Sequence, residues 1–201
     1  MILVVGDAYR QYSIATPSQI TTRFSLLVEL LEQGVGSDFF RDLKVGQEAL
    51  FKGPAGIFVY KKTGRLPLYL ATGTGLAPIL SMIETNLLNK DTIEMNLFWG
   101  LKSRSDTYLV EKLQELSVRH SNFHPHVCLS REQELADLDP KLFALGRVTV
   151  SLEAFWQQDG VDPLIYDYYV CGSQKIVTGI TDFLKQQSIP KEQIIAEKFT
   201  L

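Results

Sequence analysis

Short apolar runs alternate with segments of helical periodicity throughout residues 63–201, and this alternation restricts the possible folds more than any other feature. Strand-forming residues occupy positions 68–71, 96–99, 124–129, 168–171 and 194–197. Helices are predicted between them at 76–88, 106–116 and 176–187, and the first carries its apolar residues on one face. Strands that alternate with helices of this length predict an α/β domain, with a parallel sheet covered by helices on both faces.

The first 62 residues follow a different pattern. Strands are predicted at 2–5, 12–15, 24–31 and 48–52, with glycine-rich turns between them. A short helix is predicted at 38–43, with Ser37 as its N-cap. Many short strands separated by glycines predict a small antiparallel β-barrel. We therefore expect two domains, 1–62 and 63–201, joined by a polar linker at 61–65.

Composition excludes several classes of function. The formal net charge of −3 provides no basic surface for nucleic acid. The two cysteines, Cys128 and Cys171, lie far apart in sequence, which argues against an iron–sulfur cluster, a zinc site or a disulfide framework. There is no apolar stretch of about 20 residues and no signal peptide. We expect a cytoplasmic protein that binds no metal, nucleic acid or membrane.

The segment Gly73-Thr74-Gly75-Leu76-Ala77-Pro78 lies between a predicted strand and a predicted helix. Glycines in this position let the backbone turn tightly and approach a pyrophosphate, which the N–H groups of the helix start would bind. The alternative is a strand-to-helix turn without a ligand.

Arg10, Tyr12 and Ser13 bring a cation, an aromatic ring and a hydroxyl together within four residues. A flavin needs a flat partner for its ring, a hydrogen-bond donor near its reactive nitrogen and positive charge for its phosphate. The alternative is that Tyr12 is an ordinary strand residue and Arg10 a surface charge.

These two motifs are followed by Trp99-Gly100-Leu101-Lys102 and then by Cys171-Gly172 at the end of a predicted strand. In this order they resemble the ferredoxin–NADP reductase family, which includes reductase components of oxygenases and flavin reductases. The resemblance covers nearly the whole chain and implies FAD, in preference to FMN, as the bound cofactor.

The resemblance also assigns residues to the flavin. It implies that Tyr12 stacks on the flavin ring, that Ser13 lies near N5 with a catalytic role, and that Arg10 pairs with the phosphate. Thr16 extends this motif with a hydroxyl. Gly34, Gly36 and Ser37 match the family's second flavin motif, in which backbone amides at a helix start hold the pyrophosphate. Phe199 near the C-terminus either closes over the flavin or packs between the domains.

For the nicotinamide nucleotide, the resemblance implies contacts with Gly73, Thr74, Gly75, Lys102 and Gly172. Cys171 lies beside the nicotinamide as a second catalytic residue. Ser130 and Arg131 suit the 2′-phosphate of NADP, because a guanidinium and a hydroxyl bind a phosphate dianion well. NAD remains the alternative donor, with Arg131 then a solvated loop residue.

The expected function is transfer of a hydride from NAD(P)H to flavin, followed by electron transfer to an iron–sulfur protein, another protein acceptor or a small oxidant. Members of the family have further barrel strands ahead of the position of Met1, so the barrel is expected to be incomplete. A partner segment that completes it, or a shortened family member, are the two alternatives. The competing function is a non-catalytic nucleotide-binding or electron-transfer subunit that has lost its flavin.

Overall fold

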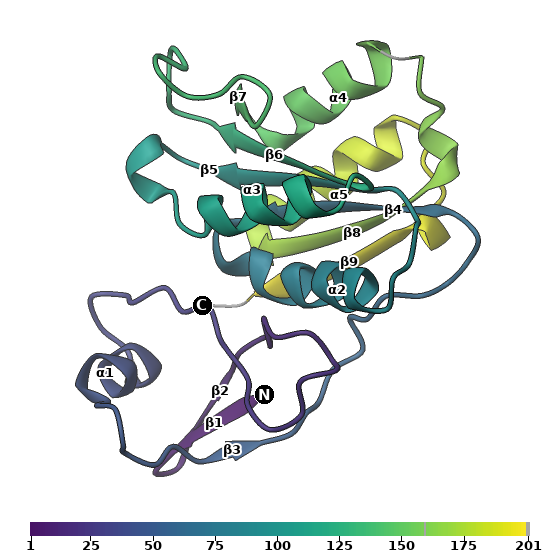
Figure 1. Cartoon of the computed structure of the whole chain (residues 1–201). Helices are drawn as coiled ribbons and strands as arrows, with labels where there is room; N and C mark the ends of the chain where they lie inside the picture. The colour runs from purple at the N-terminus through teal and green to yellow at the C-terminus, as the bar shows by residue number, and fades with distance from the viewer. Residues whose placement is uncertain (159, 200–201) are drawn as a thin grey trace.

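The computed structural model describes residues 1–158 and 160–199. Thr200 and Leu201, expected from the sequence to extend into solvent, lie outside these residues. Two regions are visible in Figure 1: a small sheet with one helix below, and a larger layered α/β region above.

The larger region is built on a six-stranded sheet with the order β7-β6-β5-β4-β8-β9. Every neighbouring pair of these strands is parallel. The strands are β4 (Leu66–Thr72), β5 (Met95–Leu101), β6 (Phe123–Leu129), β7 (Phe143–Leu145), β8 (Tyr166–Ser173) and β9 (Ile194–Phe199). The predicted parallel sheet is confirmed, and β7 is a short edge strand that the sequence pattern did not indicate.

Helices cover both faces of this sheet, as expected. They are α2 (Leu76–Leu88), α3 (Val110–Arg119), α4 (Val148–Gln158) and α5 (Gln174–Gln186). Alternate strand residues point to opposite faces. Tyr69 and Trp99 therefore join α2 and α3 in one apolar cluster, whereas Leu68 and Phe98 join α4 and α5 in the other. In Figure 1, α2 lies between the sheet and the smaller region.

Helix α3 begins later than the predicted start at residue 106. A capping box between Ser103 and Asp106 closes the short 3-10 turn η2 (Arg104–Asp106) instead. Leu109 then adopts a left-handed conformation with φ of 55°, so the chain turns once more before the helix starts.

The smaller region contains a three-stranded antiparallel sheet, and its order is β2-β1-β3. The strands are β1 (Ile2–Val5), β2 (Ala8–Gln11) and β3 (Phe51–Lys52). A small antiparallel sheet ahead of the α/β region is confirmed, but its strands are fewer and shorter than predicted. Residues 24–31 form only one bridge, between Ile14 and Leu26.

The local reasons for these differences are visible in the pairing. β2 ends at Gln11 because its antiparallel partner β1 begins at Ile2, and the last link is the bond from the Tyr12 amide to the Met1 carbonyl. Residues 12–15 are therefore a loop rather than a strand. Phe24 and Leu30 are 40% and 51% exposed, so the apolar character of residues 24–31 does not reflect burial in a sheet.

Helix α1 (Val35–Asp42) starts three residues earlier than predicted. Its N-cap is Gly34, whose φ of 142° suits glycine. Ser37, predicted as the N-cap, lies inside the helix and is buried, and its hydroxyl accepts a hydrogen bond from the Leu31 amide at 3.0 Å. No helix among the described residues is long and apolar enough to cross a membrane.

Candidate flavin and nucleotide sites

Arg10 and Tyr12 converge on the start of α1. A Cβ atom on Gly36 would collide with the Tyr12 hydroxyl and would lie 3.5 Å from Cγ of Arg10. Only glycine permits this approach, because any side chain at position 36 would displace Tyr12. The Tyr12 ring also packs edge-on against Phe40 of α1, with 5.2 Å between ring centroids. The two flavin motifs, separated by over twenty residues in sequence, thus form one cluster.

The start of α1 can bind an anion. The first intrahelical bond runs from the Asp38 amide to the Gly34 carbonyl, which leaves the N–H groups of Val35, Gly36 and Ser37 without backbone partners in the described chain. Helix starts carry partial positive charge, and the exposed Arg10 side chain lies beside this one. These residues fit the phosphate of a flavin nucleotide, through main-chain donors rather than through the Ser37 hydroxyl.

Ser13 and Thr16 continue from Tyr12 toward the larger region. Ser13 is half-buried, and its hydroxyl has no hydrogen-bond partner in the described part of the chain. The Thr16 hydroxyl accepts a bond from the Ser25 amide at 2.5 Å, and the Thr16 carbonyl accepts one from the Ser81 hydroxyl of α2 at 2.7 Å. Thr16 therefore joins the flavin motif directly to α2.

The predicted nucleotide loop forms the 3-10 turn η1 (Gly73–Gly75) between β4 and α2. A Cβ on Gly75 would overlap the Cys171 carbonyl and lie within 2.8 Å of the Gly172 amide nitrogen, so position 75 requires glycine. The Trp99 indole donates to the Gly73 carbonyl at 3.0 Å, which fixes the turn from β5. The loop is thus anchored at the carboxyl ends of three adjacent parallel strands, where α/β sheets commonly bind ligands.

Cys171 and Gly172 lie at the end of β8, opposite Glu197 and Lys198 of β9. Burial, with a smaller contribution from Glu197, raises the pKa of the Cys171 thiol above its ordinary value. The thiol is therefore protonated at neutral pH, which suits a residue that positions a ligand rather than a nucleophile. Burial also raises the pKa of Glu197. The alternation of the last strand predicts that Glu197 shares one face with Phe199, near the edge of the flavin.

Lys102, Ser130 and Arg131 follow the neighbouring strands β5 and β6. The Ser130 hydroxyl donates to the Leu101 carbonyl at 3.0 Å, and the Arg131 amide donates to the Lys102 carbonyl at 2.7 Å. The side chains of Lys102 and Arg131 are exposed. Hydrogen bonds from Ser103 hold the pKa of Asp106 below its ordinary value, and Lys102 and Arg131 add a smaller effect. Lys102, in the loop after β5, and Arg131, in the loop after β6, thus lie on two neighbouring loops that face solvent.

A third cation in these two loops, Arg104, was not predicted from the sequence. Arg104 binds both carboxylate oxygens of Asp137, at 2.5 and 2.9 Å, and its amide donates to Glu132 at 2.7 Å. These contacts join the loop after β5 to the loop after β6. Asp137 neutralises the Arg104 guanidinium, so Arg104 is less suited to bind a phosphate than Arg131 and Lys102 are.

Phe199 lies at the end of β9, opposite Ser173, and packs partly buried against the apolar cluster that contains α2. The structure thus brings together Arg10, Tyr12 and Gly36 at one place and Gly75, Cys171 and Gly172 at another. Among the described residues, no group of three or more His, Cys, Asp or Glu side chains is arranged to hold a metal ion.

Two family models match this chain. Residues 69–182 match the model of the oxidoreductase NAD-binding domain, and residues 3–60 match that of the oxidoreductase FAD-binding domain. The chain belongs to the ferredoxin–NADP reductase-like family. It carries both the FAD-binding and the NAD-binding region of that family.

Similar proteins include electron transfer components of dioxygenases. The chain is 25% identical over 194 residues to the anthranilate 1,2-dioxygenase electron transfer component of Acinetobacter baylyi, covering 96% of this chain and 54% of that protein. It is 29% identical over 195 residues to the toluate 1,2-dioxygenase electron transfer component of Pseudomonas putida, covering 96% and 55%. The chain thus spans about half the length of these curated relatives.

Among solved structures, the Amycolatopsis cytochrome P450 reductase GcoB superposes with a TM-score of 0.85 at 26% identity. The match covers all of this chain and 60% of that one.

Proposed function

We propose that this chain forms the flavin- and nucleotide-binding part of an NAD(P)H-dependent flavoprotein reductase. Residues 1–62 would bind the flavin and residues 63–201 the nicotinamide nucleotide. When bound, the flavin accepts a hydride from the nicotinamide and returns the electrons singly or as a pair.

The observation that carries this proposal is the direct link between the two sites. Thr16 of the flavin motif accepts a hydrogen bond from Ser81 of α2, the helix that starts at the nucleotide loop. Two ligands bound at these places would be held by one connected framework, and hydride transfer requires such fixed proximity.

Particular residues have distinct roles in this proposal. The Tyr12 ring supports the flavin, Arg10 and the amides of α1 bind its phosphate, and the unpartnered Ser13 hydroxyl donates to the flavin near N5. Gly75 lets the main chain of the nucleotide loop lie directly against the end of β8, and the protonated Cys171 would pack beside the nicotinamide. Phe199, which packs on the α2 cluster, would hold the end of β9 in place.

For the electron donor we propose NADP in preference to NAD. Arg131 and Lys102 both extend into solvent beside Ser130, whereas Arg104 is paired with Asp137. Two cations on neighbouring loops, neither of them in an ion pair within the described part of the chain, suit a 2′-phosphate.

For the electron acceptor we propose a protein of an oxygenase system, such as an iron–sulfur protein. Two relatives named above are electron transfer components of dioxygenases, which supports this class.

Anaerobic rapid mixing tests the function. The purified chain is loaded with FAD or FMN, and its flavin absorbance is followed after addition of NADPH or NADH. We expect bleaching of the flavin band, faster with NADPH. A protein that binds neither flavin, or whose flavin band is unchanged by both donors, contradicts the proposal and favours the non-catalytic subunit. Acid extraction and chromatography then identify the flavin retained from the host cell.

A further inference from the structure

Helix α2 carries a stripe of small polar side chains on the face turned toward residues 1–62, which we call the flavin region. Ser81, Thr85 and Asn89 are spaced four residues apart, so they lie along one side of the helix and its C-cap. The opposite side, with Ile79, Ile83 and Leu87 among its residues, packs against the sheet. Figure 1 shows α2 between the sheet and the small sheet of the flavin region.

Residues 16–19 are hydrogen-bonded along this stripe. The Ser81 hydroxyl donates to the Thr16 carbonyl at 2.7 Å, and the Ser18 amide donates to the Thr85 hydroxyl at 3.0 Å. The Gln19 side-chain amide donates to the Thr85 carbonyl at 3.0 Å and to Asn89 Oδ1 at 2.7 Å. Four bonds over four consecutive residues form a continuous contact, which we call the α2 seam.

The bonded segment continues directly from the flavin motif. Ala15 is buried, and its amide donates to the Ser25 carbonyl at 2.8 Å. Tyr12 and Ser13 lie three and two residues before Ala15 in sequence. Because so few rotatable bonds separate Ser13 from Thr16, a shift of the segment along α2 would move the Ser13 hydroxyl with it.

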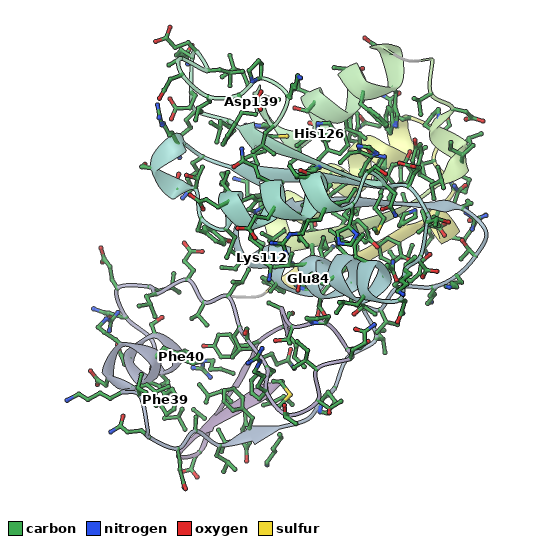
Figure 2. The ribbon with its side chains drawn as sticks, in the orientation of Figure 1. Phe39, Phe40, Glu84, Lys112, His126 and Asp139 are labelled. Atoms are coloured by element: carbon green, nitrogen blue, oxygen red, sulfur yellow. The ribbon has the colours of Figure 1, made fainter. Side chains whose placement is uncertain are left out.

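Helix α2 is itself held firmly at its other contacts. Its first residue follows Gly75, which packs against the end of β8. Lys112 of α3 pairs with Glu84 of α2 at 2.5 Å, and Figure 2 shows the two side chains meeting between the helices. The seam therefore connects residues 16–19 to a helix that is fixed at the nucleotide loop and at α3.

We infer that the α2 seam is a positioning device for hydride transfer, with Gln19, Ser81 and Thr85 as its positioning residues. It sets the distance between the flavin motif and the nucleotide loop without contacting either ligand. This inference rests on the proposed function.

The seam acts on the distance between the two ligands rather than on the affinity for either. Each ligand would be bound by its own region, through α1 and Arg10 on one side and through Gly73–Gly75 on the other. Loosening the seam therefore leaves the separate binding sites intact but broadens the distribution of distances between them. Hydride transfer is sensitive to displacements of about 1 Å, which can lower a rate about a hundredfold.

The test uses the full chain and three seam variants. Thr85→Val keeps the shape of the side chain but removes the acceptor for the Ser18 amide, and Gln19→Met keeps the length but removes the donor. Thr85→Ser retains the hydroxyl and serves as the rescue variant. Ser18→Ala is the matched control, because Ser18 contributes its main-chain amide to the seam and not its side chain.

The first readout is amide hydrogen exchange of the chain without any ligand. We expect the combined Thr85→Val and Gln19→Met variant to raise exchange at the Ser18 amide about tenfold, since this amide loses its acceptor on α2. Thr85→Ser and Ser18→Ala should exchange like the wild type. Unchanged exchange in the combined variant would overturn the seam, whether or not the chain reduces flavin.

The second readout is the anaerobic bleaching rate of the FAD-loaded chain with saturating NADPH. We expect the combined variant to lower this rate at least tenfold while the dissociation constants of FAD and NADPH change less than twofold. A rate loss matched by weaker binding of FAD would show a merely structural contact and overturn the inference. Wild-type protein that is not bleached contradicts the proposed function itself, and with it any positioning role, whereas bleached wild type with a normal variant contradicts the inference alone.

Discussion

The two regions of the molecule bury their apolar side chains to very different degrees. Residues 66–199 contribute two large clusters, one on each face of the parallel sheet. In residues 1–62, all of which the structure describes, the buried apolar residues are Leu3, Ala15 and Pro17. Ile57 is 92% exposed and Leu50 64% in the same region. Residues 63–201, which we call the nucleotide region, can thus fold around their own core. The flavin region has little core of its own.

The flavin region compensates through contacts with its neighbour. Leu27, Phe58 and Tyr60 pack against the apolar cluster under α2, and the α2 seam adds hydrogen bonds. The Tyr169 hydroxyl accepts a bond from the Lys61 amide at 3.0 Å, which ties the linker to β8. The arrangement of the flavin motif therefore depends on contacts with residues 63–201, whereas the fold of residues 63–201 depends little on the flavin motif.

The largest expected effect comes from removing core volume in the nucleotide region. Leu70→Ala should lower the free energy of unfolding by about 3 kcal/mol, because Leu70 is fully buried in the sheet. Urea unfolding followed by circular dichroism measures this. Leu50→Ala, at an exposed site of the flavin region, should change stability by less than about 0.5 kcal/mol.

Titration of core variants with flavin and with nucleotide tests which region depends on the other. Leu70→Ala should weaken flavin binding along with nucleotide binding, whereas Leu3→Ala in β1 should weaken flavin binding alone. Loss of nucleotide binding in Leu3→Ala would show that the two regions depend on each other equally.

A second expected effect is acid destabilisation of the nucleotide region through His126 of β6. The ring stacks on Phe98 with 4.5 Å between ring centroids, and its Nε2 is buried without a partner among the described residues. Burial lowers the pKa of His126 to about 4. Below pH 6.5 the unfolded imidazole binds a proton that the folded one does not. Stability due to the neutral ring is therefore complete above pH 6.5 and falls by about 2 kcal/mol as the pH approaches 4.

The control for this pH effect is His126→Phe, which keeps an aromatic ring against Phe98. Figure 2 shows where His126 lies in the layered region. Unfolding free energies measured from pH 7 to pH 4 should fall less steeply in the variant than in the wild type. Parallel curves for the two proteins would show that His126 does not titrate in this range.

A third expected effect separates close packing at the nucleotide loop from general stability. Gly75→Ala places a methyl group against the Cys171 carbonyl, which should cost about 2 kcal/mol and abolish measurable nucleotide binding. Gly179→Ala is the matched control, because its added methyl group on helix α5 would meet no described atom within 4 Å beyond its chain neighbours and the nearby backbone of the helix. That variant should be more stable by up to about 1 kcal/mol. Calorimetric titration with NADPH and thermal unfolding measure both, and nucleotide binding preserved in Gly75→Ala contradicts the assigned loop.

The smallest expected effect concerns the choice of nucleotide. Arg131→Ala should lower kcat/KM for NADPH about tenfold relative to NADH, as expected for one lost contact to a phosphate. Arg119→Ala, an exposed arginine of α3, is the control and should leave this ratio unchanged. Equal losses with both nucleotides in Arg131→Ala would assign the arginine to a part of the nucleotide that NAD and NADP share.

The sequence predicted the nucleotide region well because its signals are local. Buried parallel strands are continuous apolar runs, and α2 was predicted with the bounds that the structure shows, Leu76–Leu88. The edge strand β7 was missed since only three residues pair with β6, too few to produce a periodic pattern.

The flavin region was predicted less well, for the same physical reason that it lacks a core. Residues 24–31 are apolar enough for a strand, but their side chains pack on α2 or remain exposed rather than pairing. The approach of Tyr12 to Gly36 depends on the path of the whole loop between them, which no local pattern encodes. Arg104 was missed because its partner Asp137 lies thirty-three residues away.

The central claim is that the two regions of this chain together carry out hydride transfer. The most direct test mixes the FAD-loaded chain anaerobically with NADPH and, separately, with NADPH carrying deuterium at the transferred C4 position. The account predicts flavin bleaching with both and a slower rate with the deuterated donor, because the C4–H bond breaks in that step. A flavin band that neither donor diminishes, although FAD and the nucleotide are both bound, would contradict the account.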